Sequence, residues 1–209
     1  VYEYYENECT KNSPFHVFSV TKSILSILIG ISIDKGYIKS IHQPILDFFP
    51  DYIVKKREKT IQSITLYHMM TMTAPYKYKY APYTKYFTSE DWVKSSLDLL
   101  GGKGKIGEFR YAPVIGPDIF SGIIENTTAM TVLNFANKYL FETLEIEVPG
   151  DIIFHNKEEH SFAALGDGGN VIYINPKENM VIIIASYFKP RVKDRMKLIK
   201  EYIEPMWKE

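Results

Sequence analysis

Cysteine, charge of one sign and long apolar runs are all scarce in this sequence. Cys9 is the only cysteine among 209 residues, which excludes an intrachain disulfide framework and any CxxC metal site. The 25 basic residues balance 25 acidic ones, so the chain lacks the basic field that nonspecific nucleic-acid binding requires. The longest apolar stretch, Ser23–Ile33, is eleven residues long, against the roughly 20 of a membrane span. We expect no nucleic-acid partner and no transmembrane segment.

The sequence does not determine the cellular compartment of the protein. A cysteine-poor chain is compatible with the bacterial cytoplasm and equally with the cell envelope or the extracellular space. The first residue is Val, from which we expect a fragment or a processed form whose N-terminus does not report on export.

Composition and patterning predict a single α+β domain over residues 1–209. Hydrophobic residues make up 45% of the chain and charged residues 24%, which is typical of a globular protein. We expect a strand and loop over 1–18 (the strand at Val1–Tyr5), a mainly helical region over 19–149, and hairpin strands with a C-terminal helix over 150–209. This order favours a central antiparallel sheet flanked by helices.

Individual elements follow from hydrophobic periodicity and turn residues. Ser89 is expected to cap the helix that it begins. The remaining predictions are helices over 19–35, 65–73, 89–100, 117–127, 131–141 and 191–207 and a short helix or turn over 44–50. Strands are expected over 152–155, 161–165, 171–175 and 180–187, with hairpin turns at 156–159 and 176–179.

Lys22 is the only charged residue between Phe18 and Ile33. A lone ammonium in a buried helix is costly unless it has a partner or a task. Ser19 lies three residues earlier, on the same helical face and at the positive end of the helix dipole. Because burial favours the neutral amine, Lys22 could accept the proton of Ser19. The two residues are therefore a candidate nucleophile and base.

The spacing alone is not specific. Ser32/Lys35 and Ser186/Lys189 repeat it, although only Ser19/Lys22 opens an apolar helix. Context leaves two alternatives open: a catalytic pair, or a helix-capping Ser19 beside a Lys22 whose charged end reaches solvent.

The segment from Pro14 to Lys22, Pro-Phe-His-Val-Phe-Ser-Val-Thr-Lys, resembles the first motif of the serine β-lactamase and penicillin-binding-protein superfamily, in its class C β-lactamase, DD-peptidase and esterase branch. The resemblance continues in the same order over most of the chain. The further matching segments are Asp34–Ile38, Pro44–Pro50, Ile64–Thr73, Phe109–Pro113 (where the family has Tyr-x-Asn) and Ala164–Pro176 (the third motif).

The resemblance implies a β-lactamase/transpeptidase-like fold and acyl transfer through an acyl-enzyme, with no metal or organic cofactor. Ser19 would be the nucleophile, Lys22 the proton acceptor and Tyr111 a second general base. The backbone N–H groups of Ser19 and Asp167 would form the oxyanion hole, with Gly166 and Gly168 allowing close approach of the substrate. The substrate would be a small amide or ester, such as a β-lactam or a D-Ala-D-Ala-type cell-wall peptide.

Three differences from the family support an alternative function, a catalytically impaired domain that acts as a binding or structural module. Pro113 replaces the asparagine of the second motif, and the third motif lacks its usual Lys or His. Only 54 residues separate Tyr111 from Gly166, with Ile146–Asp151 as the expected deletion point. An incomplete pocket wall would expose apolar surface, which a homodimer could cover.

Two further patterns are weaker. His155 and His160 flank the expected 156–159 turn without the spacing of a metal site. The Lys- and Tyr-rich segment Tyr76–Tyr86 fits a pocket lip or a packed loop better than a nucleic-acid platform.

Overall fold

The computed structural model describes residues 2–10, 13, 18–78, 86, 88–112, 115–144, 162–186 and 195–207. Contacts divide the chain into two compact units. Unit 1 comprises Val1–Ser23 and Gly150–Glu209, and unit 2 comprises Ile24–Pro149. Each unit is described by itself, and the single domain over residues 1–209 stays a prediction.

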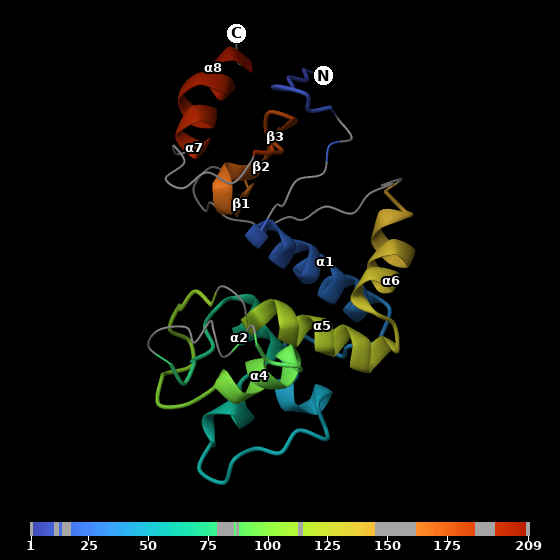
Figure 1. Cartoon of the computed structure of the whole chain (residues 1–209), viewed down its shortest axis with the longest axis vertical. Coiled ribbons are helices and arrows are strands. Elements are labelled where there is room, and N and C mark those ends of the chain that lie inside the picture. Colours follow the sequence, from blue (N-terminus) through green and yellow to red (C-terminus); the bar gives the residue numbers. More distant parts are fainter. Residues whose placement is uncertain are drawn as a thin grey trace. The chain divides into compact units, whose positions relative to one another are not determined.

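The longest apolar stretch forms a helix, as predicted. A 3₁₀ turn, η1 (Phe18–Val20), leads into α1 (Thr21–Asp34). Leu28 and Ile29 on α1 have no solvent-exposed surface. Gly36 follows the helix with a φ of +77°, a left-handed conformation that glycine adopts without strain and that commonly ends helices. Figure 1 shows α1 in blue.

The other regular elements described in unit 2 are helices, as the hydrophobic periodicity of the sequence predicted. Asp91 is the N-cap of α4: its side chain accepts the backbone N–H of Lys94. The prediction that Ser89 caps this helix is wrong, because the Ser89 hydroxyl instead accepts the Asp91 N–H at 3.2 Å. The elements are η2 (Ile45–Phe48), η3 (Thr60–Ser63), α2 (Leu66–Met70), α4 (Trp92–Leu99), α5 (Ile115–Thr128), α6 (Val132–Ala136) and the π-helical η4 (Asn137–Phe141).

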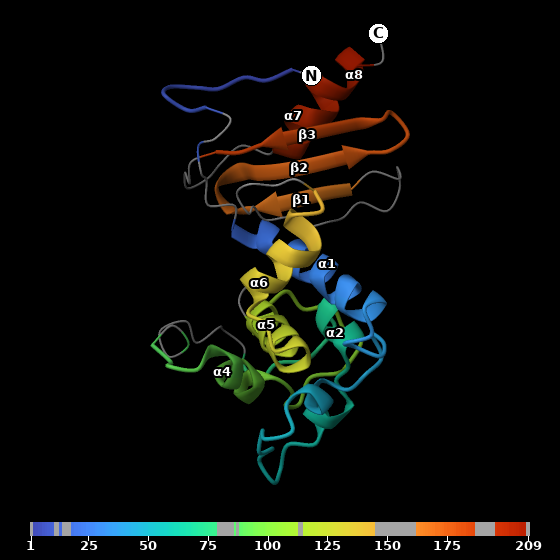
Figure 2. The ribbon, with the colours of Figure 1, turned by 90° about the vertical axis from the view of Figure 1, so that its right-hand side faces the viewer.

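The described residues of unit 1 form a three-stranded antiparallel sheet in the order β1-β2-β3 (Figure 2). The strands are β1 (Phe162–Gly166), β2 (Asn170–Asn175) and β3 (Met180–Ile184). A four-residue turn, Pro176–Asn179, joins β2 to β3, and the Asn179 N–H donates to the Pro176 carbonyl at 3.2 Å. The strands predicted at 161–165, 171–175 and 180–187 and the turn between the last two are confirmed within these bounds.

The C-terminal helix covers one face of this sheet. It consists of α7 (Arg195–Leu198), the π-helical η6 (Ile199–Ile203) and α8 (Glu204–Trp207). Ile199 packs in one apolar cluster with Val171 and Tyr173 of β2. Fold class is therefore confirmed: an α+β arrangement with an antiparallel sheet flanked by helix.

One prediction in unit 1 is wrong. Residues 2–5 of the strand expected at Val1–Tyr5 form no regular secondary structure. Alternating aromatic residues do not make a strand without a partner strand to pair with, and Tyr2 and Tyr4 are 89% and 74% exposed. The strand predicted at 152–155, the turn at 156–159 and residues 191–194 lie outside the described residues.

Two features are absent from the described ranges. None of the described helices is long and apolar enough to cross a bilayer. Across the same ranges, no three His, Cys, Asp or Glu side chains are grouped so that they could hold a metal ion.

Candidate active site

The structure brings Ser19 and Lys22 together. Lys22 Nζ donates a hydrogen bond to Ser19 Oγ at 2.7 Å. Ser19 lies in η1, directly before the first turn of α1, and both side chains are half-buried. The serine oxygen therefore lies at the positive end of a 14-residue helix with an amine beside it, which is the local arrangement that an activated serine requires.

The second pair with the same spacing has a different geometry. Ser32 Oγ donates to the Leu28 carbonyl at 2.8 Å inside the helix and is fully buried. The Lys35 ammonium lies 5.3 Å from the centre of the Tyr139 ring. Position along the helix explains the difference: Ser19 precedes the first turn, where its oxygen has no intrahelical carbonyl to bind, whereas Ser32 lies inside the last turns. Lys189, of the third pair, lies outside the described residues.

The backbone in front of Ser19 is unusual. Phe18 has a φ of +52°, a left-handed conformation that costs a residue other than glycine about 1 kcal/mol or more. The Thr21 hydroxyl donates to the Phe18 carbonyl at 2.7 Å and so ties this residue to the first turn of α1. The strained residue sets the direction in which the chain enters the helix, and with it the position of Ser19.

The predicted oxyanion segment lies in the same unit as Ser19. Gly166 ends β1, and Asp167 and Gly168 begin the short turn η5 (Asp167–Gly169) that leads into β2. Gly168 has a φ of +80°, which a side chain would oppose. The η1 segment that carries Ser19 packs against both β1 and β2. Unit 1 thus combines the nucleophile segment with the sheet that carries the third motif; the oxyanion roles of Ser19, Gly166, Asp167 and Gly168 stay predictions.

Two polar residues that hold this turn were missed by the sequence analysis. Asn170 is 2% exposed; its Nδ2 donates to the Asp167 carbonyl at 2.7 Å, and its Oδ1 accepts the Ser186 N–H at 3.0 Å. The Ser186 hydroxyl donates to the Gly168 carbonyl at 2.9 Å. A polar residue at the start of an apolar strand was the available signal, since buried amides need partners.

Tyr111 belongs to unit 2, so its part in a reaction at Ser19 stays a prediction. The side chain is 49% exposed. Its neighbour Arg110 anchors the segment: the guanidinium donates to the Tyr76 carbonyl at 3.0 Å and also to the Tyr78 carbonyl, and it lies over both tyrosine rings. Arg110 therefore joins the Tyr111 segment to the beginning of the Lys- and Tyr-rich segment, whose assignment as a pocket lip or a packed loop stays a prediction.

Comparison with known protein families shows to which family the chain belongs. A family model described as Beta-lactamase matches residues 1–150. The chain belongs to the beta-lactamase family. The matched region contains Ser19, Lys22 and Tyr111, and the resemblance to the serine β-lactamase and penicillin-binding-protein superfamily is thereby confirmed.

Solved structures of this kind of fold match nearly the whole chain. The "Crystal structure of putative beta-lactamase from Bacteroides dorei DSM 17855" has a TM-score of 0.71 at 11% identity, covering 97% of this chain and 88% of that one. The "Putative 6-aminohexanoate-dimer hydrolase from Bacillus anthracis" has a TM-score of 0.67 at 13% identity, covering 99% and 75%. At these identities the likeness shows the β-lactamase/transpeptidase-like fold alone. No curated protein matches the chain.

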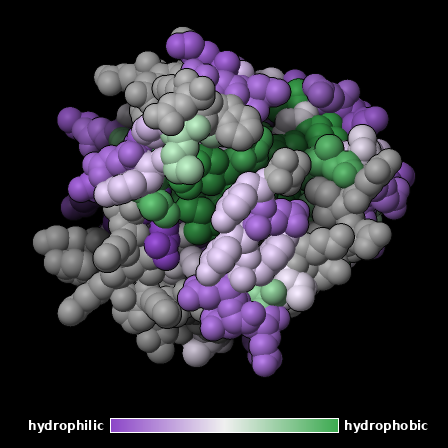
Figure 3. Space-filling view, turned by 90° about the horizontal axis from the view of Figure 1, so that it is seen from above, coloured by the Kyte–Doolittle hydropathy of each residue, from purple (hydrophilic) through white to green (hydrophobic). Residues whose placement is uncertain are grey.

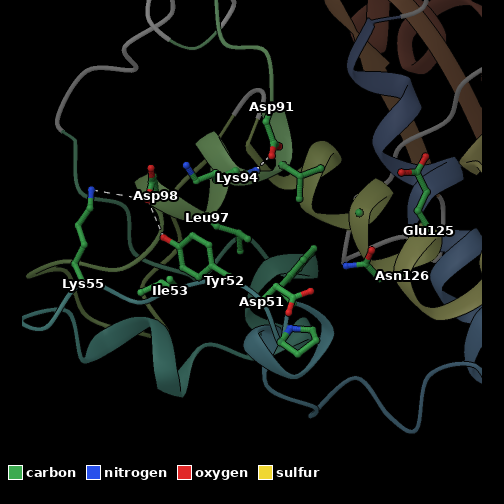
Figure 4. Close-up of a pocket in the computed structure, with 14 residues that line it drawn as sticks. Asp51, Tyr52, Ile53, Lys55, Asp91, Lys94, Leu97, Asp98, Glu125 and Asn126 are labelled. Carbon is green, nitrogen blue, oxygen red and sulfur yellow. Dashed lines mark hydrogen bonds and ion pairs between the residues drawn. The ribbon is translucent and has the colours of Figure 1, made fainter.

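Unit 2 of this beta-lactamase family member also carries an open groove of about 610 Å³. Phe49, Val93 and Leu97 line its apolar part; Figure 4 shows Leu97 among the side chains of the groove. Asp98 on its wall accepts the Tyr52 hydroxyl at 2.9 Å and pairs with Lys55 at 3.8 Å. Burial, and then the Asp98 carboxylate, raise the pKa of Tyr52. None of the residues predicted for acyl transfer lines this groove.

We expect Asn170→Ala to weaken the predicted oxyanion segment. The variant loses the hydrogen bonds to the Asp167 carbonyl and the Ser186 N–H, which are both part-buried, and each such bond contributes about 0.5–1.5 kcal/mol to the free energy of unfolding. Urea denaturation measures the stability loss, and the rate of Ser19 labelling by a fluorophosphonate measures the effect on the site. Wild-type values for both quantities would contradict the assigned role of Asn170.

Proposed function

We propose that this protein is a serine hydrolase that acts on a small amide or ester through an acyl-enzyme, with Ser19 as nucleophile and Lys22 as proton acceptor. The observation that carries the proposal is the 2.7 Å hydrogen bond between Lys22 Nζ and Ser19 Oγ. Membership of the beta-lactamase family supports it, because the matched region includes both residues.

The proposed first half-reaction forms the acyl-enzyme. Ser19 Oγ attacks the carbonyl carbon while its proton passes to Lys22 Nζ, which accepts it as the neutral amine. The new C–O bond gives a tetrahedral oxyanion, and its collapse breaks the bond to the leaving amine or alcohol. The leaving group takes up a proton that Tyr111 would deliver, and Tyr111 would regain one from Lys22, which returns to the neutral amine. Water then attacks the carbonyl carbon of the acyl-enzyme, the C–O bond to Ser19 breaks, the acid product leaves, and one water proton passes to Ser19 Oγ.

The proposed oxyanion hole uses backbone N–H groups of Ser19 and Asp167. Backbone donors of this kind are held in place before the reaction. They stabilise the negative charge that develops on the oxyanion, so each contributes a factor of about 10²–10³ in rate. Packing of η1 against β1 and β2 supports this assignment, as does the positive φ of Gly168, +80°, which keeps the turn free of a side chain at that position.

The test of this proposal is the intact mass of the protein after incubation with a fluorophosphonate and, separately, with a penicillin. Ser19 would displace fluoride from phosphorus, or open the β-lactam ring, and gain one adduct. We expect one adduct in the wild type and none in Ser19→Ala. Ser32→Ala is the matched control, because it removes the buried serine of the second Ser-x-x-Lys pair on the same helix, and it should label like the wild type.

The substrate class is tested on the same protein with a panel of amides and esters. Penicillin and D-Ala-D-Ala peptides represent the substrates that the family resemblance implies. A 6-aminohexanoate dimer belongs in the panel because it appears in the name of one structural neighbour. If folded wild-type protein forms no adduct with either reagent, the hydrolase proposal fails, and the alternative of a non-catalytic binding or structural module takes its place.

A further inference from the structure

Tyr111 lies on a segment, residues 101–112, that forms neither helix nor strand. A side chain that transfers a proton must be held in place, because a displacement of about 1 Å can cost about 10²-fold in rate. Sites on helices and strands obtain this precision from regular backbone hydrogen bonds. On the Tyr111 segment other contacts have to supply it.

Exposure by itself does not mark Tyr111 as a functional residue. Its side chain is 49% exposed, and that of Phe109 is 73% exposed. Apolar side chains at the surface are common in folded proteins, and Figure 3 shows such surface, in green, between hydrophilic side chains on one face of the molecule. What distinguishes the Tyr111 segment is the set of contacts that hold its backbone.

Two backbone hydrogen bonds tie this segment to residues 72–78. The Gly107 N–H donates to the Thr73 carbonyl at 2.9 Å, and the Arg110 N–H donates to the Met72 carbonyl at 2.7 Å. Met72 has a φ of +54°, a strained conformation that persists only where the surrounding structure imposes it. The second bond lies one residue before Tyr111 and limits the movement of its backbone.

The Arg110 side chain adds a further attachment at the same residue. One guanidinium nitrogen donates to the Tyr76 carbonyl at 3.0 Å, and the other donates to the Tyr78 carbonyl. The guanidinium carbon lies 5.7 Å from the centre of the Tyr76 ring and 5.0 Å from that of Tyr78. None of the ion pairs between described residues involves Arg110. The attachment therefore depends on the planar fork of the guanidinium and not on a carboxylate partner.

The segment that accepts these bonds is itself anchored. Tyr76 is 5% exposed and forms an isolated β-bridge with Leu100. The Lys77 N–H donates to the Leu99 carbonyl, the last residue of α4, at 2.8 Å. Because both contacts join this segment to the end of a helix, Arg110 is bound to a fixed part of unit 2.

We propose that Arg110 is a positioning residue for Tyr111, whose backbone its guanidinium holds in the place from which Tyr111 delivers a proton to the leaving group. This inference rests on the proposed function, in which the Tyr111 hydroxyl proton passes to the leaving amine or alcohol and Tyr111 regains one from Lys22. Arg110 acts through Tyr111 and transfers no proton itself. Its loss should therefore slow only those reactions whose leaving group needs a proton.

The test compares two esters of one acid, ethyl butyrate and p-nitrophenyl butyrate, in the wild type and in Arg110→Lys. Ethoxide needs a proton to leave, whereas p-nitrophenolate is stable as an anion at neutral pH. Lysine keeps the positive charge and loses the fork. We expect kcat/KM, which reports acylation, to fall by about 10–100-fold for ethyl butyrate. For p-nitrophenyl butyrate, and for fluorophosphonate labelling, we expect a change of less than about threefold.

Two further variants separate positioning from a general loss of structure. In a Tyr111→Phe background, Arg110→Lys should add no further loss with ethyl butyrate, because the hydroxyl that Arg110 positions is already absent. Arg57→Lys is the matched control: Arg57 is the other arginine of unit 2 and is exposed, so this variant should react like the wild type with both esters.

Far-UV circular dichroism should match the wild type in all variants, and Arg110→Gln, which keeps one amide donor, replaces the lysine variant if that does not fold. An equal loss with both esters, an unchanged rate with ethyl butyrate, or a full further loss in the Tyr111→Phe background would each overturn the positioning role. So would a wild type that the fluorophosphonate labels but that does not react with ethyl butyrate, since Tyr111 would then deliver no proton. A folded wild type without any fluorophosphonate adduct would contradict the hydrolase proposal itself, and the role of Arg110 with it.

Discussion

Replacement of Lys22 by methionine is expected to slow the acylation of Ser19 by a factor of about 10²–10⁴, the range for loss of a general base. Lys22 Nζ is 2.7 Å from Ser19 Oγ and is the proposed acceptor of the serine proton. Methionine keeps most of the length and the apolar part of the side chain, so the half-buried site at the start of α1 stays filled.

The rate is measured by intact mass against time with a fluorophosphonate, and the fold by circular dichroism and urea denaturation. Lys35→Met is the control, since Lys35 has the same spacing from Ser32 on the same helix but lies over the Tyr139 ring. It should leave the acylation rate unchanged. Equal rates in Lys22→Met and the wild type would show that Ser19 is activated by another group, or not at all.

Glu204→Ala is expected to lower the free energy of unfolding of unit 1 by about 2–4 kcal/mol, because it removes the centre of a buried polar network. Glu204 is 7% exposed. Its carboxylate accepts hydrogen bonds from the fully buried Tyr173 hydroxyl and from Asn175 Nδ2, the latter at 2.9 Å, and it pairs with Lys200 at 3.3 Å. The alanine variant leaves these groups without their acceptor beneath the sheet.

The loss should depend on pH. Burial would raise the pKa of Glu204, but hydrogen bonds from Tyr173 and Asn175 and the charge of Lys200 together lower it from its ordinary value of 4.5. A carboxyl with a lowered folded-state pKa contributes stability above its unfolded-state value and loses it as pH falls through the folded-state value. The difference between the wild type and Glu204→Ala should therefore be full at pH 7 and shrink in acid below pH 4.5.

Urea denaturation at several pH values tests this prediction. Glu201→Ala is the control: Glu201 lies on the same C-terminal helix, and its pair with Lys197, at 3.6 Å, is exposed, so its loss should cost less than about 0.5 kcal/mol at any pH. An equal, small cost for both variants would mean that the network adds no net stability. A cost for Glu204→Ala that does not change with pH would mean that the carboxylate charge is unimportant.

Local sequence patterns predicted much of the secondary structure of both units. The apolar run of α1 and the short apolar runs of β2 and β3, which turn residues separate, depend on neighbours in sequence, and such signals are strong when the segment is long or bounded by turn residues. The N-cap of α4 was missed because Ser89 and Asp91 are both good caps and two residues apart, so that only the backbone geometry decides between them. The strand at Val1–Tyr5 failed because strand formation needs a partner, which the segment itself cannot supply.

For the site, the sequence by itself determined that Ser19 and Lys22 share a helical face at the start of an apolar helix. Residues three positions apart lie on the same side of a helix, and the residues that follow are almost all apolar. It could not separate this pair from Ser32 and Lys35. Only the structure did so: the Ser32 hydroxyl is bound to the Leu28 carbonyl inside the helix, whereas Ser19 precedes the first turn and accepts from Lys22.

The support of the third-motif turn by Asn170 and Ser186, and the buried Tyr173–Glu204 contact, also required the tertiary structure. The Asn170–Ser186 contact joins residues 16 positions apart and the Tyr173–Glu204 contact residues 31 positions apart, and such contacts depend on which strands pair and which face the helix covers.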